Sequence, residues 1–400
     1  MKKSVLIPLF LIVFVDMLGF GFILPLMPFI AISYGLNSFF VGVLLAAYPI
    51  GQVFGTPILG RLSDRYGRKP ILFISVFGTF VSLLVLGLTR TIVLIFVSRL
   101  IDGLTGGNIS VAQSYISDVT SPQDRAKGLG LIGAAFGLGF IFGPALGGYL
   151  SQYGLQFPAL FSAGLAFINL LLIAFILPES LTKESRSKMR KSDKTQFSLK
   201  LLKETLQKPI VGPLLHGRVY FSVAQGVFQT IFALYAQKKL GLDARSTGFI
   251  LGYVGILVVL IQVFAIGPLT KRYNETVLIR YSSIFLAFSF ALWALVPNLI
   301  LLLIVLVPIS ISSGVLNTVL RSSLTKSVGA EEIGGILGLS TSLESMTSIF
   351  TPIMGGFLIG SLGTWAPGLF AALVTGSLAL FARRKIALPL VAETLHPNPL

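Results

Sequence analysis

The sequence contains no cysteine and, for its 400 residues, few charged side chains. The lack of cysteine excludes disulfide bonds, Cys-ligated metal sites and thiol catalysis. Charged residues make up only 12% of the chain, against about 25% in soluble domains. With 54% hydrophobic residues, the chain has too little polar surface to stay in water. We therefore expect it to lie in a lipid bilayer.

Acidic residues are also scarce, since 15 Asp and Glu stand against 31 Lys and Arg, for a net charge of +16. In a soluble protein this balance would suggest a nucleic acid partner. Membrane proteins, however, accumulate Lys and Arg in their cytoplasmic loops. We therefore predict no nucleic acid partner.

The sequence shows no cluster of metal ligands, no nucleophile paired with a base and no phosphate-binding loop. Its two histidines, His216 and His396, are far apart in the chain. These absences predict that the protein is not an enzyme, needs no cofactor or metal and is not driven by ATP.

Long apolar runs are what the sequence has in abundance. A spanning helix needs about 20 apolar residues, whereas a membrane β-barrel needs alternating segments of about ten residues, which do not occur here. The runs predict an all-α membrane protein. It has twelve expected transmembrane helices, at residues 5–32, 39–60, 70–89, 92–117, 128–151, 157–177, 209–236, 246–269, 276–296, 299–320, 332–359 and 365–382.

The charges of the loops predict the orientation of the chain. With the N-terminus inside, the cytoplasmic loops and tails hold 24 of the 31 Lys and Arg residues, and the opposite loops hold four. Because Lys and Arg gather on the cytoplasmic side, we expect both termini in the cytoplasm and a multi-pass protein of the cell (inner or plasma) membrane.

The two halves of the chain repeat each other weakly. Residues 60–66 match residues 267–273, and residues 141–150 match residues 349–358, at offsets of 207 and 208. A repeat of this length predicts two pseudo-symmetric six-helix bundles. We expect an N-terminal bundle at 1–178, a basic cytoplasmic linker at 179–208, a C-terminal bundle at 209–385 and a tail at 386–400. Anionic lipid is an alternative role for the linker's cations.

A charged segment between the second and third expected spans has a specific pattern. It reads Gly60-Arg-Leu-Ser-Asp-Arg-Tyr-Gly-Arg-Lys-Pro70, with Asp64 among four cations. Glycine permits tight turns, so we expect Gly60 and Gly67 to form one. Enrichment of cytoplasmic loops in cations explains the basic residues, but not Gly, Asp and Gly at this spacing. The segment resembles the signature loop of the major facilitator superfamily.

Three further segments resemble motifs of the drug:proton antiporter branch of that superfamily, which includes the tetracycline efflux proteins. They are residues 16–28 in the first span, 99–107 in the fourth and 137–148 in the fifth. The resemblance implies a major facilitator fold and drug export in exchange for protons. Tetracycline efflux proteins carry a His in the eighth span and an Asp in the ninth. Both are missing here, so we expect a substrate other than tetracycline.

The resemblance also implies roles for residues of the charged loop. Asp64 would cap a helix of the second half, and Arg65 would pair with Asp118 at the end of the fourth span. The gating loop expected in this way comprises Gly60, Asp64, Arg65, Gly67, Arg68 and Asp118.

The fifth expected span is rich in glycine. Small residues let membrane helices approach closely, so we expect a tightly packed seam. The resemblance adds an association of this motif with antiport. The motif comprises Gly139, Gly143, Pro144, Gly147 and Gly148.

Polar side chains inside the spans are candidates for proton coupling and substrate binding, because a charge there costs about 2.5–3.5 kcal/mol on the lenient insertion scale. Asp16 has no structural explanation, so we favour a function. Arg99 and Asp102 share a helix face and either neutralise each other or take part in coupling. The glutamines, also on one face, either bind substrate or join helices. The candidates are Asp16, Arg99, Asp102, Arg218, Gln225, Gln229 and Glu344.

Glu344 is the least expected of these residues. Its counterpart at the offset of 208 is Phe136, so the acid breaks the repeat. We favour a site where a cationic substrate and a proton compete, since acids within membranes are functional by default. The alternative is a structural ion pair with Arg218, which can also extend to the membrane surface.

Together these features predict a proton-coupled antiporter that exports lipophilic drug-like small molecules, cationic ones included, by alternating access. The alternative is a proton-coupled transporter of one nutrient or sugar-type solute, which tight stereospecific binding would favour. A non-transporting scaffold would not need acids in several spans. The expected partners are a small-molecule substrate, protons and the lipid bilayer, and we expect a monomer.

Overall fold

The computed structural model describes residues 3–121, 124–181, 204–329 and 332–386. These residues form helices and contain no strand, so the all-α prediction is confirmed. Most of the expected linker and nearly all of the expected tail lie outside the described residues. Two compact units result, unit 1 with Met1–Lys194 and Leu242–Gly255, and unit 2 with Thr195–Gly241 and Ile256–Leu400.

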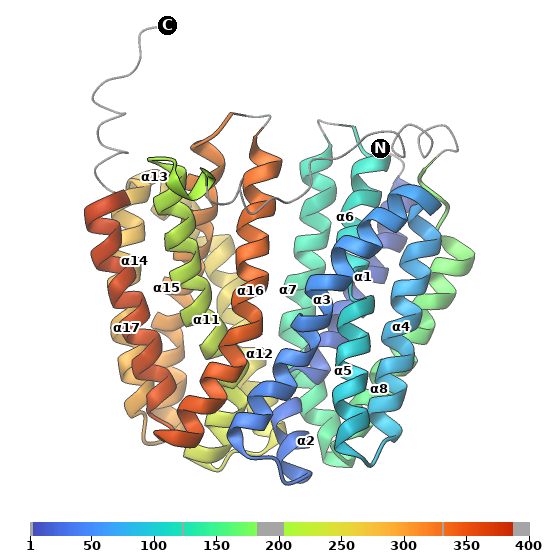
Figure 1. Cartoon of the computed structure of the whole chain (residues 1–400), viewed down its shortest axis with the longest axis horizontal. Coiled ribbons are helices and arrows are strands. Elements are labelled where there is room, and N and C mark those ends of the chain that lie inside the picture. The colour runs from blue at the N-terminus through green and yellow to red at the C-terminus, as the bar shows by residue number, and fades with distance from the viewer. Residues whose placement is uncertain (1–2, 122–123, 182–203, 330–331, 387–400) are drawn as a thin grey trace, which may run out of the picture. The chain divides into compact units, whose positions relative to one another are not determined.

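Unit 1 contains the helices of the first half of the chain (Figure 1). The start of α12 (Ala244–Leu260) also belongs to it. Its remaining helices are α1 (Lys3–Ile23), α2 (Met27–Ser33), α3 (Ser38–Tyr66), α4 (Arg68–Leu88), α5 (Ile92–Thr105), α6 (Asn108–Val119), α7 (Arg125–Leu150) and α8 (Phe157–Leu171), with short turns at Ser151–Tyr153 and Leu172–Ile176.

Unit 2 contains the helices of the second half. Buried aromatic side chains, Tyr235 and Trp293 among them, pack in its core. The Tyr235 hydroxyl donates a hydrogen bond to the Trp293 carbonyl oxygen at 2.9 Å. Its helices are α11 (Val211–Leu240), the end of α12, α13 (Ile266–Arg272), α14 (Glu275–Leu295), α15 (Leu299–Lys326), α16 (Ile333–Ser361) and α17 (Ala366–Phe381), with short π-helical segments at Ile261–Ala265 and Ala382–Ile386.

Among the described residues, 11 helical segments are long and apolar enough to cross a membrane. They coincide with the first ten and the twelfth of the expected spans. The remaining expected span, 332–359, corresponds to the 29-residue helix α16. Its serines, threonines and Glu344 lower its hydropathy, so the count of twelve stays a prediction.

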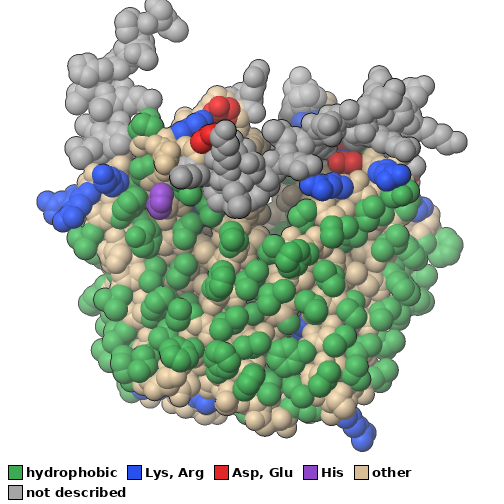
Figure 2. Space-filling view, viewed as in Figure 1, with side chains coloured by type: hydrophobic (Ala, Val, Ile, Leu, Met, Phe, Trp, Pro, Cys, Tyr) green, Lys and Arg blue, Asp and Glu red, His purple; other side chains and the backbone are tan. Residues whose placement is uncertain are grey.

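Large apolar side chains cover the outer surfaces of the helices in each unit. Phe175 is 82% exposed, Leu373 72% and Ile300 71%. Figure 2 shows hydrophobic side chains over the helix flanks and charged side chains gathered near helix ends. Soluble monomers rarely expose apolar surface of this extent, which agrees with a multi-pass membrane protein.

Two of the expected spans are interrupted inside the membrane segment. The first breaks between α1 and α2 at Pro25, because proline cannot donate the backbone hydrogen bond that continues a helix. The fourth breaks between α5 and α6 at Gly106 and Gly107, since glycine has low helix propensity. The second break places Asn108 at the start of α6, where it faces the candidate site.

The turn after α3 differs from the expected one. Gly67 has a φ of 111°, which favours glycine, and it separates α3 from α4. Gly60, by contrast, lies inside α3, which continues to Tyr66. The prediction that Gly60 forms a turn is therefore wrong, because the second helix extends six residues beyond its expected end at residue 60.

Glycines of α7 form a close-packed seam within unit 1. A methyl group on Gly143 would come within 2.7 Å of the Gly21 Cα in α1, and one on Gly139 within 2.6 Å of the Met17 Cβ. Gly147 packs on the Phe22 backbone in the same way, while Gly148 faces Gly248 of α12. Backbones at this distance leave no room for a side chain, as in other membrane helix contacts built on small residues.

This seam gives the first testable prediction. Gly143→Ala should destabilise the protein by about 1–3 kcal/mol, because the backbone of α1 has to move away. Thermal unfolding in detergent measures the effect. Gly133→Ala on the same helix is the matched control, since no described atom outside its own helix backbone lies within 4 Å of a methyl group there. Equal stability of the two variants would contradict the packing argument.

Candidate functional site

A buried polar cluster lies inside unit 1. Arg99 and Asp102 of α5 are each 5% exposed, and Asp16 of α1 lies half-buried beside them. These side chains line a cavity of ≈ 30 Å³ together with Tyr48, Thr79, Asn108 and Ser162. The structure thus brings together three residues that the sequence analysis selected, and they come from two different helices.

Arg99 is only partly satisfied by its ion pair. Its Nη1 lies 3.2 Å from Asp102 Oδ2, the self-neutralising arrangement considered from the sequence. Its Nε and Nη2 atoms are buried and have no hydrogen-bond partner among the described residues. Since a buried unpaired donor costs about 1–3 kcal/mol, this guanidinium has free donors for a further acceptor.

Asp16 is the nearby acid whose protonation state can change the charge around the Arg99–Asp102 pair. Its carboxyl lies beside Asn108 and within Coulombic range of Asp102. A cavity needs roughly 10–15 Å³ to hold one water, so the ≈ 30 Å³ here admits a water molecule between these groups. Neither Tyr48 nor Asn108 was selected from the sequence. Asn108 follows two glycines within an apolar span, a signal that was overlooked.

Unit 2 contains a second buried cluster, around Arg218 of α11. Arg218 Nε lies 2.8 Å from Glu344 Oε1 in α16, and its Nη1 donates to Asn317 Oδ1 in α15 at 2.6 Å. The Ser340 hydroxyl also donates to Glu344 at 3.0 Å. The cluster ties three helices of the unit together.

This geometry bears on the two interpretations of Glu344. The structure gives Glu344 the partner that the sequence analysis named as the alternative, Arg218 of a neighbouring helix. The alternative, an interhelical ion pair, is confirmed. The helix that carries Glu344 has no cation of its own, so the pair forms through the packing of α11 against α16. The role of Glu344 in proton or substrate binding stays a prediction.

The two candidate glutamines of α11 differ in their surroundings. Gln225 is half-buried and accepts a hydrogen bond from the Ser313 hydroxyl of α15 at 2.9 Å. Gln229, one turn later, is exposed. Gln225 therefore joins helices, which was one of its two expected roles.

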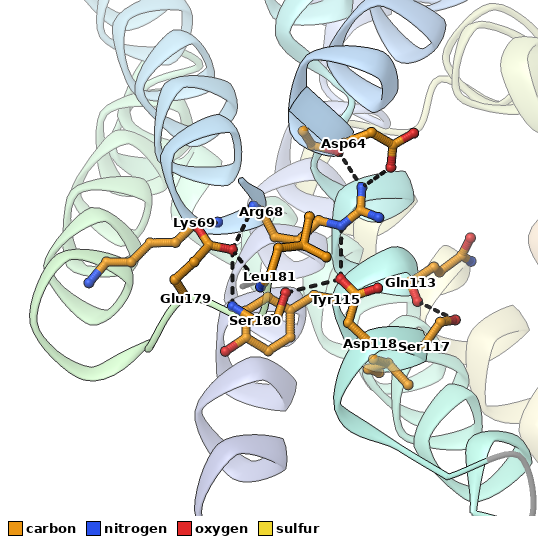
Figure 3. Close-up of polar contacts among 12 residues, drawn as sticks. Asp64, Arg68, Lys69, Gln113, Tyr115, Ser117, Asp118, Glu179, Ser180 and Leu181 are labelled. Atoms are coloured by element: carbon orange, nitrogen blue, oxygen red, sulfur yellow. Dashed lines mark hydrogen bonds and ion pairs between the residues drawn. The ribbon is translucent and has the colours of Figure 1, made fainter. Parts of the chain in front are cut away.

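Polar residues at the ends of α3, α4 and α6 form a third cluster, shown in Figure 3. Arg68 is its centre, with a side chain only 4% exposed. Its Nη1 lies 2.7 Å from Asp64 Oδ1, and its Nε lies 2.9 Å from Asp118 Oδ2. One guanidinium thus forms ion pairs with two carboxylates from different helices.

The prediction that Arg65 pairs with Asp118 is wrong. Arg65 is exposed and its guanidinium lies 5.2 Å from the centre of the Tyr66 ring. Because α3 continues to Tyr66 and Gly67 then reverses the chain, Arg68 is the cation that turns back toward α6. Spacing in the sequence could not distinguish the two arginines without the end of the helix.

The sequence analysis missed Glu179 and Ser180 in this third cluster. The Glu179 carboxylate accepts from the backbone N–H groups of Arg68 at 2.9 Å and Lys69 at 3.2 Å. These are free donors at the start of α4, where a negative charge is favourable. The Ser180 hydroxyl donates to Asp118 at 3.0 Å. An acid directly after an apolar span was the available signal.

Unit 2 repeats the ion pair of this cluster with the charges reversed. Lys326 Nζ at the end of α15 lies 2.7 Å from Glu275 Oε1 at the start of α14. Subtracting the repeat offsets, 275 − 207 gives Arg68 and 326 − 208 gives Asp118. Each unit therefore joins equivalent helix ends by one ion pair, with acid and base exchanged.

Comparison with known proteins identifies the family. The family model described as Major Facilitator Superfamily matches residues 9–352. Multidrug resistance protein 2 of Bacillus subtilis is 30% identical over 93% of each chain. The class C tetracycline resistance protein of Escherichia coli is 31% identical over 88% of each chain. The chain belongs to the Major Facilitator Superfamily.

Solved structures agree with the major facilitator fold. A human organic anion transporter matches with a TM-score of 0.67 at 22% identity, covering 95% of this chain and 99% of that one. A bacterial homologue of the human lysosomal transporter Spinster matches with a TM-score of 0.75 at 15% identity, covering 97% and 96%. This major facilitator protein is thus a multi-pass membrane transporter.

The third cluster generates a prediction about stability. Arg68→Gln should destabilise this major facilitator protein by roughly 3 kcal/mol, because two partly buried carboxylates lose their shared cation. Arg65→Gln is the matched control, three residues before Arg68. It should change the stability little, since exposed cations contribute about 0–1 kcal/mol. Thermal unfolding in detergent distinguishes the two. A larger effect of Arg65→Gln than of Arg68→Gln would instead support the pairing of Arg65 with Asp118.

The ion pair of Arg218 with Glu344 in unit 2 generates a further prediction. Glu344→Gln should destabilise the protein by about 3 kcal/mol, since Arg218 then stays buried without an opposite charge. The double variant Arg218→Met with Glu344→Leu should recover most of this loss. A double-mutant cycle of unfolding temperatures measures the coupling. If the single variant is as stable as the parent, the ion pair has no structural role.

Proposed function

We propose that the protein is a proton-coupled antiporter of the cell membrane that exports lipophilic, drug-like small molecules, cationic ones included. The observation that carries this proposal is the buried cluster of unit 1, in which Asp16 lies beside the Arg99–Asp102 pair. Both termini lie in the cytoplasm, and transport follows alternating access. The names of the relatives support drug export, since they are multidrug and tetracycline resistance proteins.

Charge balance suggests how unit 1 handles a proton. The cluster holds two acids, Asp16 and Asp102, for one base, Arg99. When both acids are ionised, the cluster carries one excess negative charge, which a proton or a cationic substrate can neutralise. Excess charge in a low-dielectric interior is unfavourable, so one of these two ligands is favoured at any time. Competition of this kind is the minimum chemistry of exchange.

The contacts of Arg99 depend on whether a proton or a cationic substrate is bound. Asp16 and Arg99 line the same cavity, so an ionised Asp16 offers a negative charge to the unpartnered Nε and Nη2 donors of Arg99. With Asp16 protonated, that charge is lost and the pair with Asp102 dominates. The two arrangements differ in how Arg99 of α5 is linked to α1. Protonation of one side chain thereby alters the contact between two helices.

Asp16→Asn tests this proposal. The variant should fold and insert, but lose about tenfold or more of proton-driven export, because the amide cannot exchange a proton. The assay uses proteoliposomes with an imposed pH gradient and a panel of cationic, neutral and sugar compounds, with internal pH recorded. Asp124→Asn is the matched control, since Asp124 lies outside the cluster and pairs with Lys127 at 3.6 Å.

Two outcomes count against the proposal. Full export by Asp16→Asn under a normal gradient would remove Asp16 from coupling. Substrate addition without any change of internal pH in the parent protein would remove the proton from the reaction. Selective transport of a single sugar or nutrient, with no response to lipophilic compounds, would favour the alternative of a nutrient transporter.

A further inference from the structure

A basic cavity lies at one end of unit 2, apart from the buried clusters. It has a volume of ≈ 460 Å³ and is formed by the segment before α11, the first turns of α11 and the turn that ends α17. Figure 2 shows histidine and Lys or Arg side chains along this edge, above hydrophobic ones. The lining comprises Leu206, Gln207, Lys208, Pro209, Pro213, His216, Phe381, Arg384 and Lys385.

Part of the cavity wall is apolar and held in place. The His216 ring is fixed by a 2.8 Å hydrogen bond between its Nδ1 and the Gly212 carbonyl oxygen. The Phe381 ring packs against it at 6.0 Å, and Tyr220 packs on Phe381 at 5.8 Å. Such a wall suits the glycerol and first methylene groups of a lipid better than a fully hydrated ion.

The charges of the lining all have one sign. Lys208, Arg384 and Lys385 are exposed cations, and no acid is among the described residues that line the cavity. Lys208 Nζ lies 3.6 Å from Glu332 Oε2, but both side chains are about half exposed, so this pair is weak. No ion pair of the described residues involves Arg384 or Lys385. The cavity therefore attracts an anion.

A track of exposed leucines leads along α17 toward these cations. Leu369, Leu373 and Leu380 are 36%, 72% and 63% exposed, and their spacings of four and seven residues place them on one helix face. At about 1.5 Å per residue the track is roughly 16 Å long, comparable to much of an acyl chain. Arg384 follows one turn after Leu380, where the headgroup of such a chain would lie.

We propose that an anionic phospholipid binds at this site. Its phosphate contacts Arg384 and Lys385, its glycerol packs on His216 and Phe381, and one acyl chain follows the leucines of α17. Basic pockets beside membrane helices bind anionic headgroups in this way. The site is separate from Asp16 and the other candidate transport residues, so it stands independently of the proposed exchange reaction.

The test compares lipids on the purified full-length protein. Native mass spectrometry in detergent measures binding of phosphatidylglycerol, phosphatidylcholine and deacylated glycerophosphoglycerol. We expect the first phosphatidylglycerol to bind about tenfold or more tightly than phosphatidylcholine, and Arg384→Gln with Lys385→Gln to remove that preference. The deacylated headgroup should not compete, because it lacks the chain that follows the leucines.

Lys271→Gln with Arg272→Gln is the matched control. These residues are also two consecutive exposed cations in the last turn of a helix of unit 2, but they do not line the cavity. The control variant should keep the lipid preference. Equal loss in both variants would overturn the proposal in favour of general charge attraction, and full competition by the deacylated headgroup would reduce the site to a phosphate site. If the double variant unfolds, Arg384→Gln and Lys385→Gln are measured singly.

Discussion

A charge within an apolar helix has to be matched by another polar group, and this constraint organises both units. In unit 2, Arg218 reaches Glu344 on one neighbouring helix and Asn317 on another, so its charge is matched by packing. In unit 1, Arg99 and Asp102 lie one turn apart on the same helix. That local pair leaves the Nε and Nη2 donors of Arg99 unused. The first arrangement is complete, whereas the second is open to a further group.

The internal repeat preserves an ion pair at the helix ends but not the charges in the helix interiors. The pair of Arg68 with Asp118 returns as Glu275 with Lys326, with acid and base exchanged. An ion pair holds two helix ends together whichever end carries the acid, so packing alone permits this exchange. In the interior, adding 208 to Asp16 and Arg99 gives Ala224 and Val307. Interior charges are thus specific to each unit, as their different chemistry requires.

Composition, apolar runs and the repeat were sufficient to predict the helical membrane fold and eleven of its spans, because the bilayer sets the length and polarity of each helix. They also placed Asp16, Arg99 and Asp102 among the seven candidate residues, but did not predict that the three lie together. Side-chain partners were beyond this reasoning. The resemblance implied Arg65 as the partner of Asp118, and hydropathy does not encode the end of α3 at Tyr66 that selects Arg68 instead. Arg218 was named only as an alternative partner of Glu344, because it lies 126 residues away.

The net charge of each cluster bears on which acid suits the proposed exchange of protons for substrate. In unit 2, Arg218 and Glu344 cancel, so a proton added to Glu344 would leave an uncompensated arginine and oppose its own binding. In unit 1, two acids face one base, so a proton added to Asp16 brings the cluster to neutrality. The sequence alone made Glu344 the more unusual acid, since it interrupts the repeat. Its ion pair with Arg218 instead favours Asp16 as the exchangeable acid of the proposed antiport.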